Sequence, residues 1–579
     1  MFRLVSEDGM KSLGVTFLLM CSLLVFVISV SVIRGLAPDE SMVLLPVVIS
    51  PPQDLSIDHI EITQAIQTPT NNVPLVEGRP TVARIYARNS VASIAETTIS
   101  LSASRNGISL GSITIGPQVV PASYSRADIN SSFNVRLPYD WLHGDITMQA
   151  MLDPNNEINE TDETNNSYVD DLNFIFVPPL NLTIVPVNFT DKETGKFYPA
   201  PTMDRASDWI MRMYPIPKVN TVLRTPIDYH GSFYDPIYGG WLELIVLVMD
   251  IKELDGVPYS TVYYGYVSNG NFSRSSAGGG GNRLGVGLDY GPGSDKPTSM
   301  LAAHEVGHGL KLNHAPCGVG AVEGYFPYPE GIIGHYGLDV SEMKVYPPTQ
   351  HDFMSYCKEW VSDFHYNAMI RDQLITSDKQ RIATQPSLFV RVNIAPNGDI
   401  VFLPIYEVLA PPSVSATVSD FTMVLLDTKG RELSSKQVEV QDINLGESNA
   451  TWRRITSLLS IQPGDAVSGV QLMHKGKVIA EKQLSSPAAN NLEKPVLKRG
   501  NNSSNVNVSW NSLGRPAIVQ FVEDNNNTRI TLGIDVTDGD VVIDLMTLPY
   551  GIGHFEIILA DQLNHPPILS ERITNNRED

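Results

Sequence analysis

The pattern of apolar and polar positions changes character several times along the chain. An almost unbroken apolar run covers residues 13–33, and short alternating stretches follow as far as about residue 177. Longer apolar runs mark residues 180–383, and alternation then returns. Alternation with a period of two is typical of half-buried strands, whereas continuous apolar runs indicate central strands or buried helices. We therefore expect β-rich regions on both sides of a mixed α and β region.

The first apolar run is long enough to cross a bilayer as a helix, with 21 residues from Leu13 to Ile33. A cleaved secretion signal usually has a shorter apolar core, and the small-residue motif Ser29-Val30-Ser31 falls inside the run. We expect residues 1–36 to form an N-terminal hydrophobic helix that anchors the protein in a membrane, with a long signal peptide as the alternative. Both interpretations place the rest of the chain outside the cell.

The region from residue 53 to 178 is predicted to be a β-sandwich, because alternating stretches such as Val82–Arg88 are separated by turn residues. Its acidic, Asn-rich segment Asp153–Asn166 resembles the last hairpin of CARDB-type, immunoglobulin-like adhesion modules. A calcium loop of the EF-hand type needs Gly and Glu where this segment has Ile158 and Thr164. We therefore interpret the segment as a solvated turn.

The remaining regions complete a multidomain prediction. Residues 180–383 are expected to form an α+β domain, in which Leu242–Met249 reads as a central strand and Ser299–Leu312 as a helix. Residues 384–488 are expected to form a second β-sandwich. Residues 500–575 weakly resemble a fibronectin type III module.

Composition narrows the range of partners. A hydrophobic fraction of 42% and a charged fraction of 18% are typical of globular proteins. The formal net charge of −22 argues against a nucleic-acid partner, since phosphate binding needs a basic face. Asn-x-Ser/Thr acceptors for glycosylation are frequent, and their use depends on the host. Examples are Asn130, Asn159, Asn181, Asn188, Asn271, Asn449 and Asn507.

The residues with the clearest chemistry lie in the predicted helix Ser299–Leu312. His304 and His308 are four residues apart and therefore share one face of it, with Glu305 beside the first. A catalytic zinc site needs three protein ligands and one open position. A continuing helix would carry His314 ~9 Å beyond His308 along its axis. The third histidine can reach the metal only if the helix ends and the chain turns back.

These residues resemble the metzincin zinc proteases, whose motif is His-Glu-x-x-His-x-x-Gly-x-x-His. The chain matches every ligand position of that motif. About 40 residues downstream, Asp352–Cys357 is similar to the Met-turn of the same family, in which Met354 would form an apolar floor under the histidines. The resemblance extends over residues 181–373 and implies a metzincin-like catalytic domain at the centre of the chain.

The resemblance also implies a function and a role for each residue. His304, His308 and His314 are expected to hold one Zn²⁺ ion, with Glu305 as the general base. Tyr356 is expected to bind the metal or to stabilise the oxyanion. The chain is thus predicted to be a zinc endopeptidase of extracellular proteins, with its β domains bound to a cell surface or a polymer. An adhesion or scaffold protein with an inactive or structural catalytic domain, and a zinc hydrolase of non-peptide substrates, remain alternatives.

Two cysteines lie near this motif. Apart from Cys21, which falls in the apolar run, Cys317 and Cys357 are an even number in an exported region, which favours a disulfide over two free thiols. They follow His314 and Met354 by three residues each. If both segments line one metal site, a bridge would clamp the loop of the third ligand to the Met-turn.

One position departs from the family pattern. Lys311 stands where the metzincins have Gly or, less often, Asn, and a left-handed conformation costs other residues ~1–2 kcal/mol. Lys311 could accept that strain, Asn313 could supply the left-handed residue instead, or activity could be lost. In this family a strand before the active-site helix binds substrate by strand addition, and Arg283–Asp289 is the candidate for that edge.

Overall fold

The computed structural model describes most of the chain beyond the first apolar run. The expected membrane anchor, residues 1–36, and the acceptors Asn271 and Asn449 lie outside the described residues. Within them, no helix is long and apolar enough to cross a membrane. The described residues are 53–575, apart from 92–94, 234–238, 271–276, 281–282, 293–297, 320–323, 375–382, 414–418, 444–451, 463–464, 485–492, 501–503 and 564–565.

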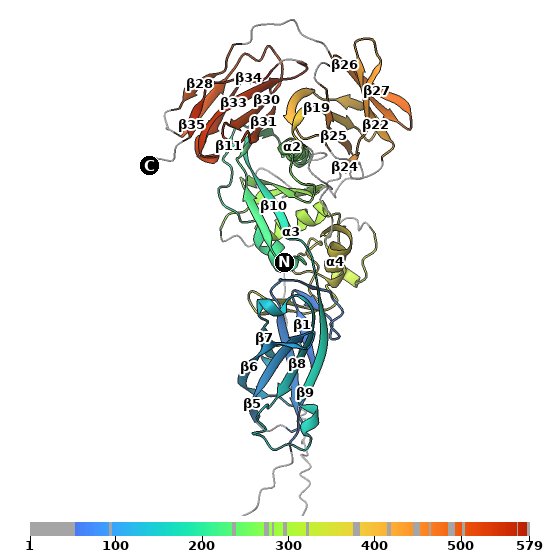
Figure 1. Ribbon diagram of the computed structural model, residues 1–579, viewed down its shortest axis with the longest axis vertical. Coiled ribbons are helices and arrows are strands. Elements are labelled where there is room, and N and C mark those ends of the chain that lie inside the picture. The colour runs from blue at the N-terminus through green and yellow to red at the C-terminus, as the bar shows by residue number, and fades with distance from the viewer. Residues whose placement is uncertain are drawn as a thin grey trace, which may run out of the picture. The chain divides into compact units, whose positions relative to one another are not determined.

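Two sheets that share one apolar core form the region nearest the N-terminus (Figure 1). The core includes Phe133, Trp141 and Leu152, which are buried between the sheets. The first sheet has the order β1 (Leu55–Thr63), β4 (Val82–Asn89), β7 (Phe133–Arg136). The second has the order β3 (Leu75–Val76), β9 (Ser167–Ile175), β8 (Gly144–Leu152), β5 (Ala95–Arg105), β6 (Ile108–Val120).

A seven-stranded sheet occupies the middle of the chain, and parallel pairs dominate it. Five strands follow one another across the sheet in the order β11 (Phe197–Tyr198), β10 (Leu180–Asp191), β14 (Val262–Ser268), β16 (Leu284–Asp289), β15 (Ala277–Gly280). Two further strands, β12 (Val219–Leu223) and β13 (Ile227–Gly231), also pair with β10. One face packs against α1 (Ser207–Met213) and α3 (Thr298–Gly309). The other packs against α2 (Gly239–Asp255). Parallel strands with both faces covered have near-continuous apolar sequences, as here.

The segment Leu242–Met249 is helical, so the prediction of a central strand there is wrong. It lies within α2, whose residues Leu244, Ile245 and Val248 are buried against the sheet. A short apolar run does not distinguish a strand from a helix that is covered on several sides. The apolar outer surface of α2 is explained by the C-terminal sheets that cover it.

The predicted fold class is corrected as well. Strands account for 47% of the described residues and helices for only 13%. After the metal motif, the only described α-helix is the short α4 (Asp363–Ala368), which is followed by a π-helical turn, Met369–Leu374. The described chain is a predominantly β protein and not one built around an α+β metzincin-like core.

The C-terminal part contains four further sheets around two apolar cores. One sheet of the first core consists of β19 (Gln385–Ile394), β20 (Ile400–Phe402), β21 (Tyr406–Ala410), β24 (Gln441–Ile443) and β25 (Trp452–Ser460). The other sheet of this core consists of β22 (Phe421–Asp427), β23 (Glu432–Gln437), β26 (Val467–His474) and β27 (Lys477–Gln483). The sheets of the second core are formed by β28 (Val496–Arg499), β29 (Asn505–Ser509) and β32 (Asp540–Asp544), and by β30 (Ala517–Glu523), β31 (Arg529–Val536), β33 (Gly551–Leu559), β34 (Ile568–Leu569) and β35 (Ile573–Asn575).

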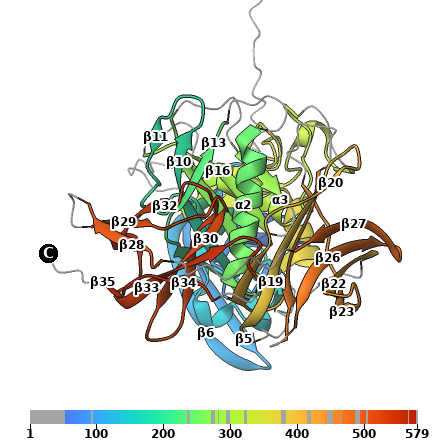
Figure 2. The same cartoon turned by 90° about the horizontal axis from the view of Figure 1, so that it is seen from above.

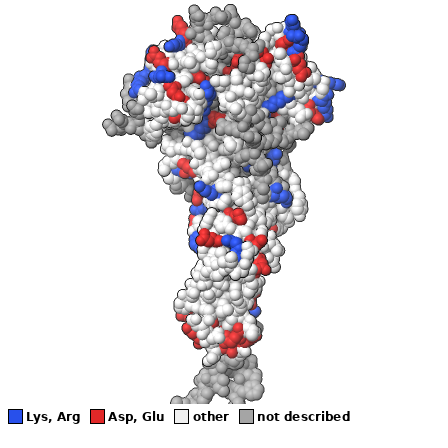
Figure 3. Space-filling model, viewed as in Figure 1, with Lys and Arg blue, Asp and Glu red and all other residues white. Residues whose placement is uncertain are grey.

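Helix α2 is the element on which these C-terminal sheets meet (Figure 2). Asp250 accepts hydrogen bonds from Arg391 at 3.1 Å and from Arg454 at 2.7 Å, and all three side chains are buried. Arg224 binds Asp255 of α2 and also donates to the carbonyl of Thr531. On the face shown in Figure 3, acidic and basic side chains are interspersed over the described C-terminal strands. The Asp250 contacts that join these sheets to α2 are, by contrast, buried.

Candidate metal centre

Glycines on both β16 and α3 allow the helix to lie close to the central sheet. A Cβ atom on Gly285 would lie 3.2 Å from the backbone of Glu305, and one on Gly309 would lie 2.6 Å from the carbonyl oxygen of Leu284. At the start of the helix, the Thr298 hydroxyl accepts from the backbone N–H of Tyr290 at 3.0 Å. The close approach fixes the height of α3 above the sheet and buries its residues His304 and Glu305 almost completely.

The helix ends in a Schellman motif that turns the chain back. Lys311 has a φ of 63°, the N–H of Lys311 donates to the His308 carbonyl at 2.8 Å, and that of Leu312 to the Gly307 carbonyl at 3.0 Å. Leu312 is buried, as the residue after the left-handed position commonly is. The turn brings Nε2 of His314 to 3.0 Å from Nε2 of His308. Lys311, rather than Asn313, therefore supplies the left-handed residue.

We expect Lys311→Gly to stabilise the protein. Removal of the side chain relieves ~1–2 kcal/mol of backbone strain, and the larger entropy of an unfolded glycine offsets ~0.5–1 kcal/mol of it. Thermal unfolding should show a net gain of about 0.5–1 kcal/mol. Lys311→Ala keeps the strain and serves as the control. A glycine variant no more stable than the alanine variant would contradict the assignment of strain.

Backbone carbonyls orient two of the three imidazoles. Nδ1 of His304 lies 2.8 Å from the Phe353 carbonyl oxygen, and Nδ1 of His308 lies 2.9 Å from that of Leu312. A histidine that donates from Nδ1 to a carbonyl keeps the lone pair of Nε2 for a metal, as is usual in metal sites. The ligand atoms of the three histidines all lie within 4.8 Å of one another. Two nitrogens bound to one tetrahedral Zn²⁺ ion lie about 3.3 Å apart, so the donor set and its spacing fit such an ion.

Burial keeps these imidazoles uncharged at neutral pH. Loss of solvation lowers the pKa of His304 well below its usual value. For His308, loss of solvation and then the nearby His314 lower the pKa to about 3. Loss of solvation, followed by the positive charge of Lys358, lowers the pKa of His314 to about 4. Neutral imidazole is the form that binds metal ions, so the site needs no deprotonation before it binds.

Met354 and Tyr356 lie beside the histidines. Met354 is fully buried, and a Cβ atom on Gly307 would lie only 2.5 Å from its sulfur, so the methionine packs directly under α3. Tyr356 is 42% exposed, and its ring centroid lies 5.2 Å from that of His314. Tyr356 therefore borders both the cluster and the solvent.

Cys317 and Cys357 form a disulfide with a Cα–Cα distance of 5.9 Å. It joins the loop that carries His314 to the segment that carries Met354. Two backbone hydrogen bonds run alongside it, from Ala315 N–H to the Met354 carbonyl at 3.2 Å and from Tyr356 N–H to the Cys317 carbonyl at 3.1 Å. The structure thus brings the residues singled out in the sequence into one place.

Sequence reasoning missed the buried pair Asp352 and His365 behind this segment. Asp352 has no exposed surface, and its carboxylate accepts from Met354 N–H at 2.7 Å, Ser362 N–H at 2.9 Å and His365 Nδ1 at 2.8 Å. The carboxylate therefore fixes the turn whose next residue, Phe353, orients His304. The feature of the sequence that could have indicated this pair is the acidic residue Asp352, two positions before Met354.

Substitution of His365 should weaken metal binding without removing a ligand. His365→Leu removes one of the two donors to Oδ1 of the buried Asp352 and leaves only the Met354 N–H, whereas His365→Asn keeps an N–H close to the position of Nδ1. Loss of an outer hydrogen-bond partner typically weakens metal binding by about 10–100-fold. We expect a loss of that size for the leucine variant and a smaller one for asparagine, measured by competition with a zinc chelator. Equal affinities for both variants would show that the Asp352–His365 bond does not position the site.

The predicted substrate edge is wrong. Strand β16, which contains the predicted segment Arg283–Asp289, lies between β14 and β15. The antiparallel strand β15 (Ala277–Gly280) pairs with β16 over its length and forms this edge of the sheet as described. The glycine run that precedes β16 in the sequence folds back to cover it, a long-range pairing that periodicity does not reveal.

The N-terminal sheets contact the segments behind the metal cluster. Strand β2 (Ile66–Gln67) pairs with β17 (Tyr336–Asp339), which pairs in turn with β18 (Lys344–Tyr346). The Trp360 indole donates to the Ala65 carbonyl at 2.8 Å. The fully buried Arg79 guanidinium donates to the carbonyls of Met211, Arg212 and Ile216 at the end of α1. The first domain is therefore packed into the core that carries the site.

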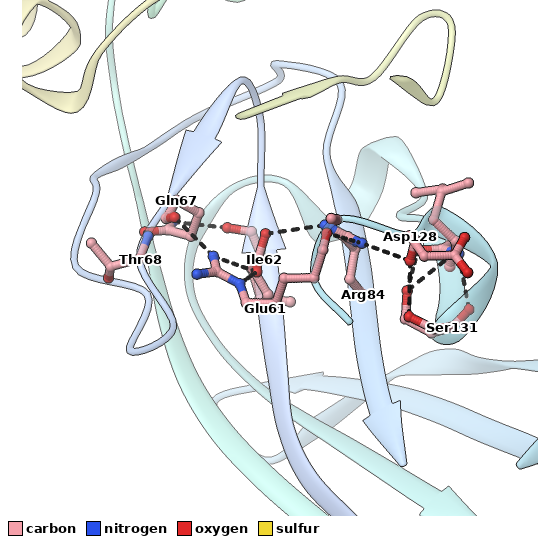
Figure 4. Close-up of polar contacts among 12 residues, drawn as sticks. Glu61, Ile62, Gln67, Thr68, Arg84, Asp128 and Ser131 are labelled. Atoms are coloured by element: carbon pink, nitrogen blue, oxygen red, sulfur yellow. Dashed lines mark hydrogen bonds and ion pairs between the residues drawn. The ribbon is translucent and has the colours of Figure 1, made fainter. Parts of the chain in front are cut away.

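A second buried carboxylate supports this contact (Figure 4). Glu61 on β1 lies 2.7 Å from Arg126 and 3.8 Å from Arg84. Burial raises the pKa of Glu61, and the two arginines act in the opposite direction. Arg126 also lies over the ring of Tyr336 on β17, 4.8 Å from its centroid. The cluster thus connects β1 with the strand that follows the metal-binding loop.

Comparisons with known proteins identify the first domain. The CARDB family model matches residues 91–170, so this part of the chain is a CARDB domain. No curated protein matches the chain. A crystal structure of a Pyrococcus furiosus CARDB domain in complex with di-metal ions is 15% identical, with 22% of this chain and 96% of that chain covered and a TM-score of 0.16. A β-glucuronidase from Parabacteroides merdae is 9% identical, with 90% and 77% covered and a TM-score of 0.14. Likenesses at these TM-scores define neither the fold nor the activity of this chain.

Proposed function

We propose that the protein is a zinc-dependent endopeptidase that hydrolyses extracellular proteins. The observation that carries the proposal is the cluster of His304, His308 and His314, whose ligand atoms lie within 4.8 Å of one another beside Glu305. Their spacing, together with Met354 packed under the helix, is the pattern of the metzincin proteases. The resemblance is one of motif and local geometry.

Each residue of the site has its own role in the proposed hydrolysis. A bound Zn²⁺ ion supplies Lewis acidity, which acidifies water and polarises a carbonyl oxygen. Glu305, which follows the first ligand on α3, accepts a proton from the attacking water and returns it to the leaving amine. Tyr356 lies at the rim of the site, where its hydroxyl would bind the oxyanion or the metal. His304 and His308 keep their orientation through the carbonyls that accept from Nδ1.

The edge of the central sheet supports a polypeptide substrate over a small molecule. Strand β15 ends the described sheet next to α3, and an extended peptide can add to such an edge through main-chain hydrogen bonds. Because such binding uses main-chain hydrogen bonds, peptides of many different sequences could bind in this way. We expect the peptide bond to be cleaved where the added strand passes the three histidines.

The remaining domains suggest where the enzyme acts. The disulfide fits an oxidising environment, and residues 1–36 would either anchor the protein in a membrane or be removed on secretion. The CARDB domain and the C-terminal sheets would then bind a cell surface or a polymer. We infer an extracellular enzyme whose β domains position the metal site.

Metal analysis of the full chain, combined with a casein cleavage assay, tests the proposal. We expect one zinc ion per chain, loss of cleavage on chelation, and recovery when zinc is restored. His308→Ala should lose both metal and activity. A preparation that binds no zinc would refute the enzyme assignment, and one that binds zinc without cleaving protein would support the scaffold alternative.

A further inference from the structure

A second group of side chains that could bind a metal ion includes residues close to Met354 and His314 in the sequence. The ligand atoms of Cys317, Cys357 and His351 all lie within 4.8 Å of one another. In the folded chain the two sulfurs are joined as a disulfide. Two thiolates and an imidazole form one of the common donor sets for Zn²⁺ once that bond is open.

The imidazole of His351 is already oriented for such a role. Its Nδ1 lies 3.2 Å from Oε2 of Glu359, and the same oxygen accepts from the backbone N–H of His351 at 2.7 Å. A carboxylate that accepts from Nδ1 is the usual partner of a metal-binding histidine, because it holds the ring and leaves Nε2 as the coordinating atom. The Glu359 carboxylate thus orients His351 in the same way as the Phe353 carbonyl orients His304.

The two cysteines are held together by more than the disulfide. The N–H of Tyr356 donates to the Cys317 carbonyl, and that of Ala315 to the Met354 carbonyl. On the His351 side, the N–H of Asp352 donates to the Gly331 carbonyl at 2.7 Å. These bonds do not depend on the sulfurs. Reduction should therefore leave both thiols facing each other and His351.

We propose that Cys317, Cys357 and His351 bind a thiophilic divalent cation, such as Zn²⁺, whenever the disulfide is reduced. A phosphine reductant breaks the S–S bond and takes an oxygen from water to become a phosphine oxide, which leaves two thiols. Zn²⁺ then displaces one proton from each thiol, and both protons pass to solvent. Water fills the fourth position. The bound cation replaces the disulfide as the clamp between the His314 loop and the Met354 segment.

The test separates this site from the histidine cluster. In the full chain with His304→Ala and His308→Ala, the oxidised protein should bind no zinc and the phosphine-reduced protein one zinc per chain. Co²⁺ in place of zinc should give the near-ultraviolet thiolate charge-transfer band. Cys357→Ser should abolish both signals, and His351→Ala should abolish stoichiometric binding. Glu359→Ala should weaken binding by about 10–100-fold, as outer partners of metal ligands do.

Several results would overturn the proposal. Reduced protein that binds no more zinc than oxidised protein would do so, as would unchanged binding in His351→Ala. Near-ultraviolet circular dichroism follows the fold during reduction. Loss of that signal on reduction would contradict the premise that backbone bonds hold the segments together. The outcome is independent of peptidase activity, because the variant lacks two of the three histidines of the first cluster.

Discussion

Glu305→Gln should abolish peptide hydrolysis while the zinc content stays unchanged. Glutamine has nearly the same shape, so α3 and its histidines keep their places, but an amide cannot accept a proton. Glu305 is only 7% exposed and follows His304 directly on the helix. General base catalysis contributes about 10²–10⁴-fold. We expect a loss of that size in the rate of casein cleavage, with zinc measured in the same samples.

Glu330→Gln provides the matched control, because Glu330 is an exposed residue of the loop between the histidines and the Met354 segment. This variant should cleave casein at the rate of the unmodified protein. Full cleavage by Glu305→Gln would refute the role given to this carboxylate. Loss of zinc from the Gln variant would instead show that Glu305 holds the site together.

Asp250→Ala should destabilise the protein more than any other substitution considered. The Asp250 side chain is 3% exposed and binds Arg391 and Arg454, whose side chains are 1% and 0% exposed. Removal of one partner of a buried ion pair leaves an uncompensated charge and costs about 3–5 kcal/mol. Arg391 keeps a second partner in Asp535, so we expect a loss near the lower end, about 3 kcal/mol, in urea unfolding.

Asp420→Ala is the control for that measurement. Asp420 and Lys475 form an ion pair at 3.8 Å in which both side chains are more than half exposed. Exposed pairs contribute about 0–1 kcal/mol because water and salt screen them. Equal unfolding free energies for the two variants would contradict the view that α2 is held by a buried charge cluster. Limited proteolysis between β18 and β19 would show whether the C-terminal sheets separate first in Asp250→Ala.

The integration of the domains was not visible in the sequence. The segments around residues 178 and 384 read as domain boundaries, yet Ala65 and Arg79 of the first domain reach into the core beside Trp360 and α1. Asp250 likewise fixes the C-terminal strands to α2. Changes in composition mark where one pattern of apolar and polar residues gives way to another. They carry no information about which surfaces are buried together in the folded chain.

The sequence by itself determined the local part of the site. Helical spacing puts His304 and His308 on one face, the left-handed requirement was placed at Lys311 or Asn313, and Asp153–Asn166 indicated the CARDB domain. Each of these inferences depends on residues close together in the chain, where spacing fixes geometry. The closeness of Cys317 and Cys357 was inferred only on the condition that both segments line one site.

Only the tertiary structure decided what depends on distant partners. Leu242–Met249 is a helix because sheets cover it on both sides, and β16 is internal because the glycine run β15 folds back on it. Asp352 and His365 form a buried pair across a turn, and His351 meets the two cysteines from another loop. Burial, pairing and desolvation arise between segments far apart in the sequence. Local periodicity therefore revealed the ligands, and the fold decided what surrounds them.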